Sequence, residues 1–367
     1  MRSCTTLVIL FCFIVAISQG QIINTATMDT LPTTTIGHLA VGGYMDSYYG
    51  YSFNKPSSGT IPYFVSSNRH DEMNINLAYI DLRYKSTNFR ARFVPAYGTY
   101  MNSNYANEIG TLKNIVEATA GLRLSAKRNI WVDVGVFTSP YTNESPFSKD
   151  QLMYTRSFAP ENVPYYLSGV KVSVPLSKKI NSFLYLLNGW QVIQDNNKNK
   201  SIGTQLEYRP SKKMLFNWDT YVGNNQNQAN PSWRMRYFTD LYWIYKHSDR
   251  FDATSCVYIG FQERVGAGTL NWWQANVAGR YHFNETLSLS GRLEYFSDGG
   301  IHQQSITGIG LFNSYSTGLC LNYKANHNAL LRVEGRHFFS ADQVYINESQ
   351  NPAQNSTWLI TSLTAWF

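Results

Sequence analysis

Charged side chains recur at every second position in several stretches of this sequence. Arg90 and Arg92 are separated by one residue, and Arg332, Glu334 and Arg336 repeat that spacing. In an extended chain, residues two apart point to the same side, so these side chains would form a charged row along one face. Fixed rows of charge can select the ions and polar solutes that pass along them. The first chemistry that the sequence suggests is therefore selection by charge.

Signals for catalysis or for a bound metal are weak. The sequence has no GxSxG, HExxH, Walker or GxGxxG motif in a suitable context. Its seven histidines do not cluster with cysteines or carboxylates at metal-ligand spacing. We therefore expect no catalytic residue, no cofactor and no metal site. Two alternatives stay open: a hydrolase that assembles Ser, His and Asn from separate strands, and a calcium ion at Asp195–Asn197, where turn chemistry is the simpler interpretation.

The first twenty residues have the features of a secretory signal peptide. Arg2 provides a short positive region, Leu7–Ile17 is apolar, and Ser18 and Gly20 are small residues next to the cleavage point. A signal anchor is the alternative, but the apolar run is too short to span a bilayer. We expect cleavage after Gly20 and export of the mature chain.

The composition excludes several classes of protein. Removing Arg2 from the 31 Lys and Arg leaves 30, against 24 Asp and Glu. No later run approaches the ~20 apolar residues of a membrane-spanning helix. Aromatic residues make up 15% of the chain and charged residues only 15%, against ~25% charged residues in an ordinary globular domain. This balance favours strands that face lipid on one side and water on the other. Much of the positive charge lies in tight turns, so no nucleic-acid partner is expected.

Apolar and polar residues alternate from residue 38 to the end of the chain. In Val116–Ser125, for example, Leu122 and Leu124 lie on one face and Glu117 and Arg123 on the other. Such alternation predicts half-buried strands. We predict about sixteen of them, at residues 38–50, 75–85, 88–100, 115–125, 130–138, 163–174, 180–190, 201–209, 214–223, 234–246, 251–263, 270–283, 286–297, 314–324, 328–339 and 356–367.

The connections between these strands alternate in length. They are short after even-numbered strands, as at 85–88 and 125–129, and long after odd-numbered strands, as at 51–74 and 139–162. Short turns at one end and long loops at the other are typical of a transmembrane β-barrel. We therefore predict an all-β fold, an antiparallel up-and-down barrel of about 16 strands, with 14 or 18 as alternatives. Because every backbone group in lipid must be paired, the last strand is expected to close on the first.

No linker or repeat divides the mature chain. We therefore predict one outer-membrane barrel domain at 38–367, after the signal peptide at 1–20 and a short periplasmic segment at 21–37. Cys256 and Cys320 are the only cysteines after residue 20. They project to the same interior face about three strands apart, or ~14 Å at ~4.8 Å per strand. That separation is too large for a disulfide, so we expect two free thiols.

Several segments resemble one known family. Phe137–Phe158, Pro164–Val172, Asn188–Pro210 and Tyr221–Asn225 are similar to the OmpL-like β-barrel porins, with an Arg-Ser loop, an Asn-Gly-Trp and an Asp-Asn-Asn loop in the family's order. Val136 departs from the pattern, where a basic residue would be expected. The terminal Phe367 resembles the aromatic residue by which the barrel-assembly machinery recognises its clients. The resemblance implies an outer-membrane location and a pore.

Interior positions opposite the apolar faces carry many charges. A sixteen-stranded barrel is wide enough for an aqueous channel. The pore-lining candidates are Arg83, Arg90, Arg92, Arg123, Arg280, Arg292, Glu294, Arg332, Glu334 and Arg336, with Glu117, Asp133, Glu207, Arg236 and Asp240 as further interior charges. The excess of arginine favours anions or polar solutes. The alternative is that these charges pair across neighbouring strands and only fill the lumen.

The loop at 139–162 is among the longest. In porins of similar size a long third loop folds into the pore, so its charged residues are constriction candidates: Glu144, Lys149, Asp150, Arg156 and Glu161. An ordinary exposed loop is the alternative. Aromatic residues near strand ends are expected to form interfacial girdles, with a carbohydrate-stacking surface as the alternative; these residues are Tyr48, Tyr49, Tyr100, Trp190, Tyr221, Trp243, Tyr295, Trp358 and Trp366.

Together these patterns predict a porin-like channel of the cell outer membrane for passive diffusion of small hydrophilic solutes, with a preference for anions and no enzymatic activity. The alternative is a plugged barrel that acts as a scaffold or subunit of a larger outer-membrane complex. The expected partners are outer-membrane lipid and the barrel-assembly machinery, through the C-terminal strand ending in Phe367. A homo-oligomer or a membrane-complex partner also stays open.

Overall fold

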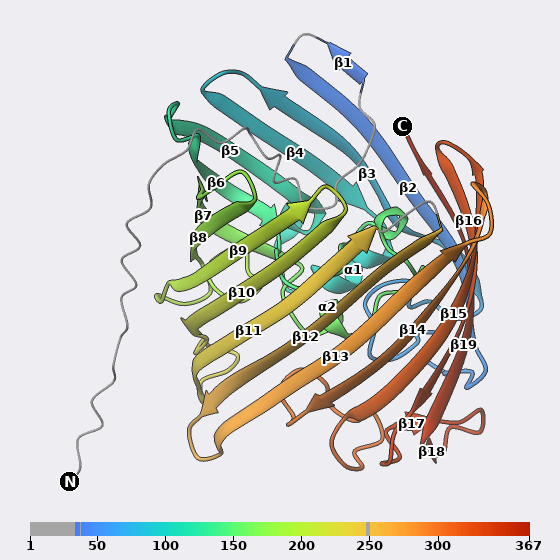
Figure 1. Cartoon of the computed structure of the whole chain (residues 1–367). Coiled ribbons are helices and arrows are strands. Elements are labelled where there is room, and N and C mark those ends of the chain that lie inside the picture. The colour runs from blue at the N-terminus through green and yellow to red at the C-terminus, as the bar shows by residue number, and fades with distance from the viewer. Residues whose placement is uncertain (1–33, 37, 247–249) are drawn as a thin grey trace.

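The computed structural model describes residues 34–36, 38–246 and 250–367. The predicted signal peptide lies outside these residues, as does most of the segment at 21–37. The described part of that segment, Thr34–Ile36, forms the short strand β1 and pairs with the start of β2. Figure 1 shows the carboxyl terminus at the same end as β1 and the pair β17–β18 at the opposite end.

One sheet of seventeen strands forms the body of the structure, and without the short β1 it is a closed antiparallel ring of sixteen (Figure 1). The ring strands are β2 (Leu39–Ser52), β3 (Glu72–Lys85), β4 (Phe89–Tyr97), β5 (Ile115–Ser125), β6 (Ile130–Thr138), β7 (Tyr166–Pro175), β8 (Ile180–Leu187), β9 (Ser201–Ser211), β10 (Met214–Asn224), β11 (Trp233–Lys246), β12 (Phe251–Arg264), β13 (Gly268–His282), β14 (Leu287–Asp298), β15 (Asn313–Asn326), β16 (Ala329–Phe339) and β19 (Asn355–Trp366).

The predicted barrel is confirmed, and each ring strand corresponds to one predicted strand. The observed bounds of β5 and β6 coincide with the predicted ones. Strand β4 ends at Tyr97 instead of residue 100, because Gly98 has φ 137° and turns the chain into a helix. The short and long connections alternate as the sequence indicated, with one exception. Only residues 265–267 join β12 to β13, so this connection at the long-loop end is a tight turn.

The last strand closes the ring on the first. Strand β19 pairs with β2 along its length, with Leu363 opposite Ser47. Beyond the last paired residues, Gly43 and Phe367 exchange both backbone hydrogen bonds at 3.0 Å. A Cβ on Gly43 would lie 2.1 Å from the Phe367 ring, so glycine leaves room for that ring. The predicted closure is therefore confirmed at the level of individual hydrogen bonds.

Short elements lie in the long loops. They are α1 (Thr99–Asn104), α2 (Phe158–Glu161), the 3₁₀ turns η1 (Gly110–Asn114) and η2 (Ser148–Asp150), and the two-residue strands β17 (Tyr345–Ile346) and β18 (Pro352–Ala353). In the described part of the chain, no helix has the length and apolar character needed to cross a membrane.

The outer face of the ring is apolar and the inner face is polar and aromatic. Leu293 and Leu319 are each 62% exposed on the outer face, as lipid-facing residues should be. The girdle prediction is wrong for part of its set, because Tyr48, Tyr100, Trp190, Tyr221 and Trp358 are packed inside the molecule. Trp358, for example, is only 3% exposed, whereas its neighbour Leu359 is 41% exposed. Aromatic type alone does not distinguish the two faces of a strand.

Candidate functional site: the barrel interior

Residues 139–162, called the inner loop below, lie inside the barrel and are mostly buried. The backbone N–H of Thr142 donates to Asp240 on β11 at 2.6 Å. The side chain of Asn143 donates to Asn276 on β13 at 3.0 Å. The loop therefore rests against a wall that is about one hundred residues away in the sequence. The ordinary exposed loop is not what the structure contains.

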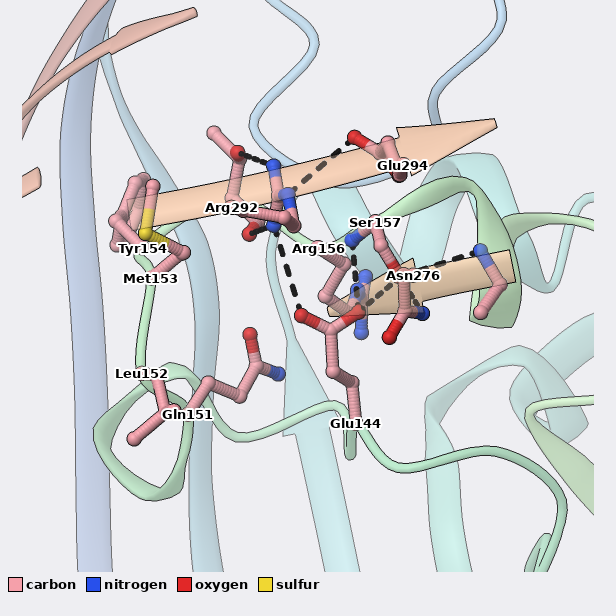
Figure 2. A network of polar contacts seen from close by, with 12 residues as sticks. Glu144, Gln151, Leu152, Met153, Tyr154, Arg156, Ser157, Asn276, Arg292 and Glu294 are labelled. Atoms are coloured by element: carbon pink, nitrogen blue, oxygen red, sulfur yellow. Dashed lines mark hydrogen bonds and ion pairs between the residues drawn. The ribbon is translucent and has the colours of Figure 1, made fainter. Parts of the chain in front are cut away.

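A buried guanidinium holds the middle of the inner loop. Arg292 on β14 donates to the backbone carbonyl of Thr155 at 2.6 Å. Its nitrogens also lie 3.3 Å from Glu294 and 3.6 Å from both Glu144 and Glu334. Figure 2 shows Arg292 joined to Glu144 on the loop and to Glu294 on the wall. Only 1% of the Arg292 side chain is exposed, so these charges compensate one another away from bulk water.

Carboxylates of the wall accept backbone amides of the inner loop. Glu334 on β16 accepts the N–H groups of Tyr154 at 2.8 Å and Thr155 at 2.9 Å. Glu294 accepts the N–H of Phe158 at 2.6 Å. Hydrogen bonds to an ionised acceptor are roughly twice as strong as neutral ones. The two glutamates therefore fix the path of the loop as well as its charge balance.

Arginines of the wall donate to loop carbonyls in a complementary way. Arg280 on β13 donates to the carbonyls of Gln151 and Leu152 at 2.6 and 2.7 Å. Arg332 on β16 donates to the carbonyl of Ser148 at 2.7 Å. These arginines were predicted to line the pore. The structure instead engages them with the inner loop, and they do not border the cavity described below.

Arg336 joins the inner loop to the first long loop, residues 53–71. It donates to the carbonyl of Arg156 at 2.8 Å. Its guanidinium lies 4.5 Å from the ring centres of both Phe64, in the first long loop, and Phe338, on β16. Desolvated cation–π contacts of this kind contribute about 2 kcal/mol. One cation thus packs against two loops and the wall.

Two ion pairs lie within the inner loop. Lys149 and Asp150 are 2.8 Å apart, and Arg156 and Glu161 are 3.6 Å apart. The Arg156 guanidinium also lies 4.5 Å from the ring centre of Tyr165. All four charged side chains are at most 7% exposed. Of the five constriction candidates, only Glu144 also borders the open cavity.

A cavity of about 310 Å³ lies between the inner loop and the other half of the barrel, β3–β9. The segment at 144–147 forms part of its loop side. The charged residues that line it are five basic and three acidic side chains: Arg83, Lys85, Arg90, Arg92, Lys171, Glu117, Asp133 and Glu144. Polar solutes that enter this cavity meet more cations than anions.

The arginines of the cavity pair with carboxylates along the wall. Arg92 lies 2.7 Å from Asp81 and 2.9 Å from Glu117, and Arg90 donates to Asp133 at 2.6 Å. The side chains of Arg92 and Arg90 remain 17% and 30% exposed, while that of Asp81 has no exposed surface. The carboxylates thus hold the guanidinium groups in place, and the guanidinium groups present the more accessible charge.

Gly121 allows one of these pairs to form. In the strand register, Gly121 on β5 stands between Arg90 on β4 and Asp133 on β6. A Cβ at this position would lie 2.2 Å from the Oδ1 atom of Asp133 and 3.2 Å from the Cγ atom of Arg90. A residue without a side chain lets the two charged groups meet across β5.

We expect Gly121→Val to separate Arg90 from Asp133 and to push a branched side chain into the cavity. The barrel should lose about 1–3 kcal/mol of stability, as overpacked sites do, and its single-channel conductance should fall. The temperature at which gel mobility changes on heating measures the first effect. The control is Gly335→Val, since a Cβ at Gly335 meets no atom within 4 Å. Unchanged heat stability and conductance in the Gly121 variant would contradict the expectation.

One pore-lining candidate lies away from the cavity, and two charged inner-face residues were not predicted. Arg123 donates to the carbonyl of Ala126 at 3.0 Å in a tight turn and does not border the cavity. Sequence reasoning missed Asp81 and Lys171. Both occupy inner-face positions, and Lys171 lies 5.1 Å from the ring centre of Phe137. Asp81 is two residues before Arg83, so the period-two pattern could have found it.

No metal site emerges from the described residues, which hold no group of three His, Cys, Asp or Glu side chains suited to a metal ion. Asp195 accepts the backbone N–H of Asn197 at 3.0 Å and forms an ion pair with Lys200, which is turn chemistry. Cys256 and Cys320 are free and buried, so the prediction of two free thiols is confirmed.

Burial raises the pKa of Glu144 above the ordinary value of 4.5, and the nearby Arg292 guanidinium opposes that rise. The carboxylate accepts hydrogen bonds from the backbone and the hydroxyl of Ser157. Glu144 is therefore protonated at a higher pH than an exposed glutamate, and the charge of the loop side of the cavity depends on pH.

Comparisons with known proteins agree with this architecture. The model of the family described as "Putative beta-barrel porin-2, OmpL-like" matches residues 38–367. No curated protein sequence matches the chain.

Solved structures show the same fold at low sequence identity. OmpF of Salmonella typhi, in complex with daunomycin, is similar with a TM-score of 0.60 and 11% identity, over 90% of this chain and 97% of that chain. An anion-selective porin from Comamonas acidovorans has a TM-score of 0.57 and 10% identity, over 90% and 99%. A trimer form of OmpT from Vibrio cholerae has a TM-score of 0.56 and 10% identity, over 90% and 99%.

Proposed function

Because the chain belongs to the putative beta-barrel porin-2, OmpL-like family, and so is a porin-like channel of the outer membrane, we propose that small hydrophilic solutes cross it between the inner loop and the wall of β3–β9. The proposed transport is passive diffusion of solutes past the charged lining of the cavity. The observation that carries the proposal is the cavity of about 310 Å³ on that side of the lumen.

The lining of the cavity favours anions. Five basic and three acidic side chains line it, and the side chains of Arg90 and Arg92 are more exposed than those of their carboxylate partners. Rings of Arg and Lys favour anion passage in pores. The preference is expected to be moderate, because the arginines are partly neutralised by Asp81, Glu117 and Asp133.

Planar-bilayer recording of the purified full chain tests the proposal. We expect discrete conductance steps and, in a gradient of potassium chloride, a reversal potential of the sign that marks chloride preference. A barrel that gives no conductance steps would contradict the proposal that the protein is a channel. A cation-selective reversal potential would reject the anion preference while leaving the channel intact.

The pH dependence of selectivity follows from Glu144. Its pKa is raised by burial above the ordinary value of 4.5, so on acidification from pH 7 Glu144 should be protonated at a higher pH than an ordinary glutamate. Loss of this negative charge should increase the ratio of chloride to potassium permeability. Reversal potentials measured during this acidification in wild type and in Glu144→Gln check the prediction. The variant should show the acid selectivity already at pH 7, and an identical pH response in both proteins would exclude Glu144 as the cause.

A plugged barrel is the second candidate, and one observation favours it. Phe64 of the first long loop packs with Phe158 of the inner loop and with Phe338 and Trp358 of the wall. This aromatic cluster narrows the long-loop half of the lumen. In that case the barrel would serve as a scaffold or subunit of a membrane complex. A stable co-purifying partner together with electrical silence would support it against the channel.

The proposal includes the surroundings of the barrel. Residues 1–20 would direct export, outer-membrane lipid would surround the apolar face, and the strand ending in Phe367 would be recognised by the barrel-assembly machinery. The trimer form of the similar OmpT supports a homo-oligomer. No enzymatic activity is assigned, since the family is one of porins.

A further inference from the structure

The tight turns carry a concentration of positive charge that permeation does not explain. Three adjacent hairpin turns each hold two basic residues, and all six are exposed: Lys127 and Arg128 between β5 and β6, Lys178 and Lys179 between β7 and β8, and Lys212 and Lys213 between β9 and β10. Neighbouring hairpins are two strands apart, or about 10 Å at ~4.8 Å per strand. The six cations, called the basic turn cluster below, therefore span about 20 Å of the barrel rim.

The two ends of the barrel differ in charge. Further exposed cations occupy other turns at the same end, at Lys85, Lys246, Arg250 and Lys324. The described residues of these turns contain one exposed acidic residue, Glu285. In the long loops at the other end, acidic and basic residues are nearly equal in number. The net positive charge of the chain is therefore concentrated at the short-turn end of the barrel.

The basic turn cluster adjoins the lipid-facing surface. Leu124, Leu176 and Tyr208 lie at the ends of the same strands or beside the turns and are 65%, 46% and 41% exposed. Tyr208 also stacks on Phe216, with ring centres 6.2 Å apart. Apolar residues next to a belt of lysines match the change from acyl chains to headgroups in a bilayer leaflet.

We propose that the basic turn cluster binds the phosphate groups of anionic phospholipids in the leaflet around the short-turn end of the barrel. The cluster follows the rim over six strands, β5–β10, with lipid-facing residues directly beside it. That arrangement fits a row of headgroups around the barrel better than one acidic protein docked on a single face. The attraction is electrostatic, so each cation adds to it and salt weakens it.

Quenching of tryptophan fluorescence by brominated lipids tests this site. The full chain is reconstituted in phosphatidylcholine vesicles that contain brominated phosphatidylglycerol or, for comparison, brominated phosphatidylcholine. Trp218, 52% exposed on the outer face of β10, lies in this sector. Trp273, 39% exposed on β13, also contributes to the signal, so the lysine variants below assign the preference to the cluster. At low salt we expect phosphatidylglycerol to be preferred by about three- to tenfold, with the preference falling toward one at ~1 M salt.

Two variants that each lose four lysines distinguish binding at this cluster from a general attraction between a positively charged protein and anionic lipid. K178Q/K179Q/K212Q/K213Q removes four cations of the cluster, and K55Q/K113Q/K198Q/K200Q removes four lysines from the long loops. We expect the first variant to lose the preference and the second to keep it, with both retaining heat-modifiable gel mobility. An equal loss in both variants, or no preference in wild type, would overturn the proposal. Lysine-dependent retention on isolated peptidoglycan without a lipid preference would also overturn it, in favour of the cell wall as the partner.

Discussion

Replacing Arg90 and Arg92 together with glutamine is expected to abolish the anion preference of the channel. The double variant leaves Glu117 and Asp133 along the cavity wall without the arginines that pair with them, while Asp81 keeps Arg83 as its partner. Two unit charges ~8 Å from a passing ion change its energy by roughly 1–2 kcal/mol in a medium between water and protein. The ratio of chloride to potassium permeability should therefore fall severalfold toward one, because three basic and three acidic side chains then line the cavity.

The reversal potential in a potassium chloride gradient measures this change. A matched control is Arg123→Gln with Arg128→Gln, which removes the same charge at positions that do not border the cavity. Arg90 and Arg92 are partly exposed, but their carboxylate partners are buried, so the double variant should be less stable than the control. Heat-modifiable gel mobility checks that its barrel has folded. Equal reversal potentials in the test and control variants would show that ions do not pass this wall.

Arg292→Leu is expected to release the inner loop and to increase conductance severalfold. Arg292 holds the Thr155 carbonyl and faces Glu144, Glu294 and Glu334. Removing one partner from a buried ionic group typically costs about 3–5 kcal/mol, because the remaining charges are left uncompensated. The least costly response is for the inner loop to move out, which places Glu144 in water and widens the lumen.

Single-channel recording detects the change as larger and noisier steps. Arg123→Leu is the control, since Arg123 donates to a turn carbonyl and not to the inner loop. If the Arg292 variant fails to fold, Arg292→Met combined with Glu334→Gln keeps the experiment informative, because it removes one charge of each sign. That second variant should lie closer to wild type in conductance. Wild-type conductance in Arg292→Leu would mean that the loop is held by its other contacts alone.

The period-two pattern was enough to predict the wall of the barrel. Leu122 and Leu124 differ from Glu117 and Arg123 in polarity at alternating positions, and a strand surrounded by lipid and water has to separate such residues between its faces. The alternation of short and long gaps then predicted the hairpins, their two ends and the closing strand. These features depend on residues that are neighbours in the sequence or lie on adjacent strands, so short stretches of the sequence were enough to predict them.

The same pattern could not divide the interior charges between their roles. Arg90 and Arg292 both alternate with apolar residues, yet Arg90 borders the cavity and Arg292 holds the inner loop. The two arginines differ in their position relative to the inner loop: the loop covers the part of the ring that contains Arg292 and leaves the part with Arg90 open to the cavity. The contacts of the inner loop join residues that are far apart in the sequence, such as Thr142 with Asp240, 98 positions apart, and Tyr154 with Glu334, 180 positions apart.

The sequence by itself determined a sixteen-stranded barrel, its polar inner face and its excess of inner-face arginine. The reason is that successive residues of a strand point to opposite faces, so an alternating sequence gives one apolar and one polar face. The tertiary structure decided that the inner loop lies against β11–β16, that its carbonyls and amides engage the charges of that wall, and that the open cavity faces Arg83, Arg90 and Arg92. A folded loop pairs with whichever buried charges compensate it best, and that choice depends on the whole ring and on no single stretch of the chain.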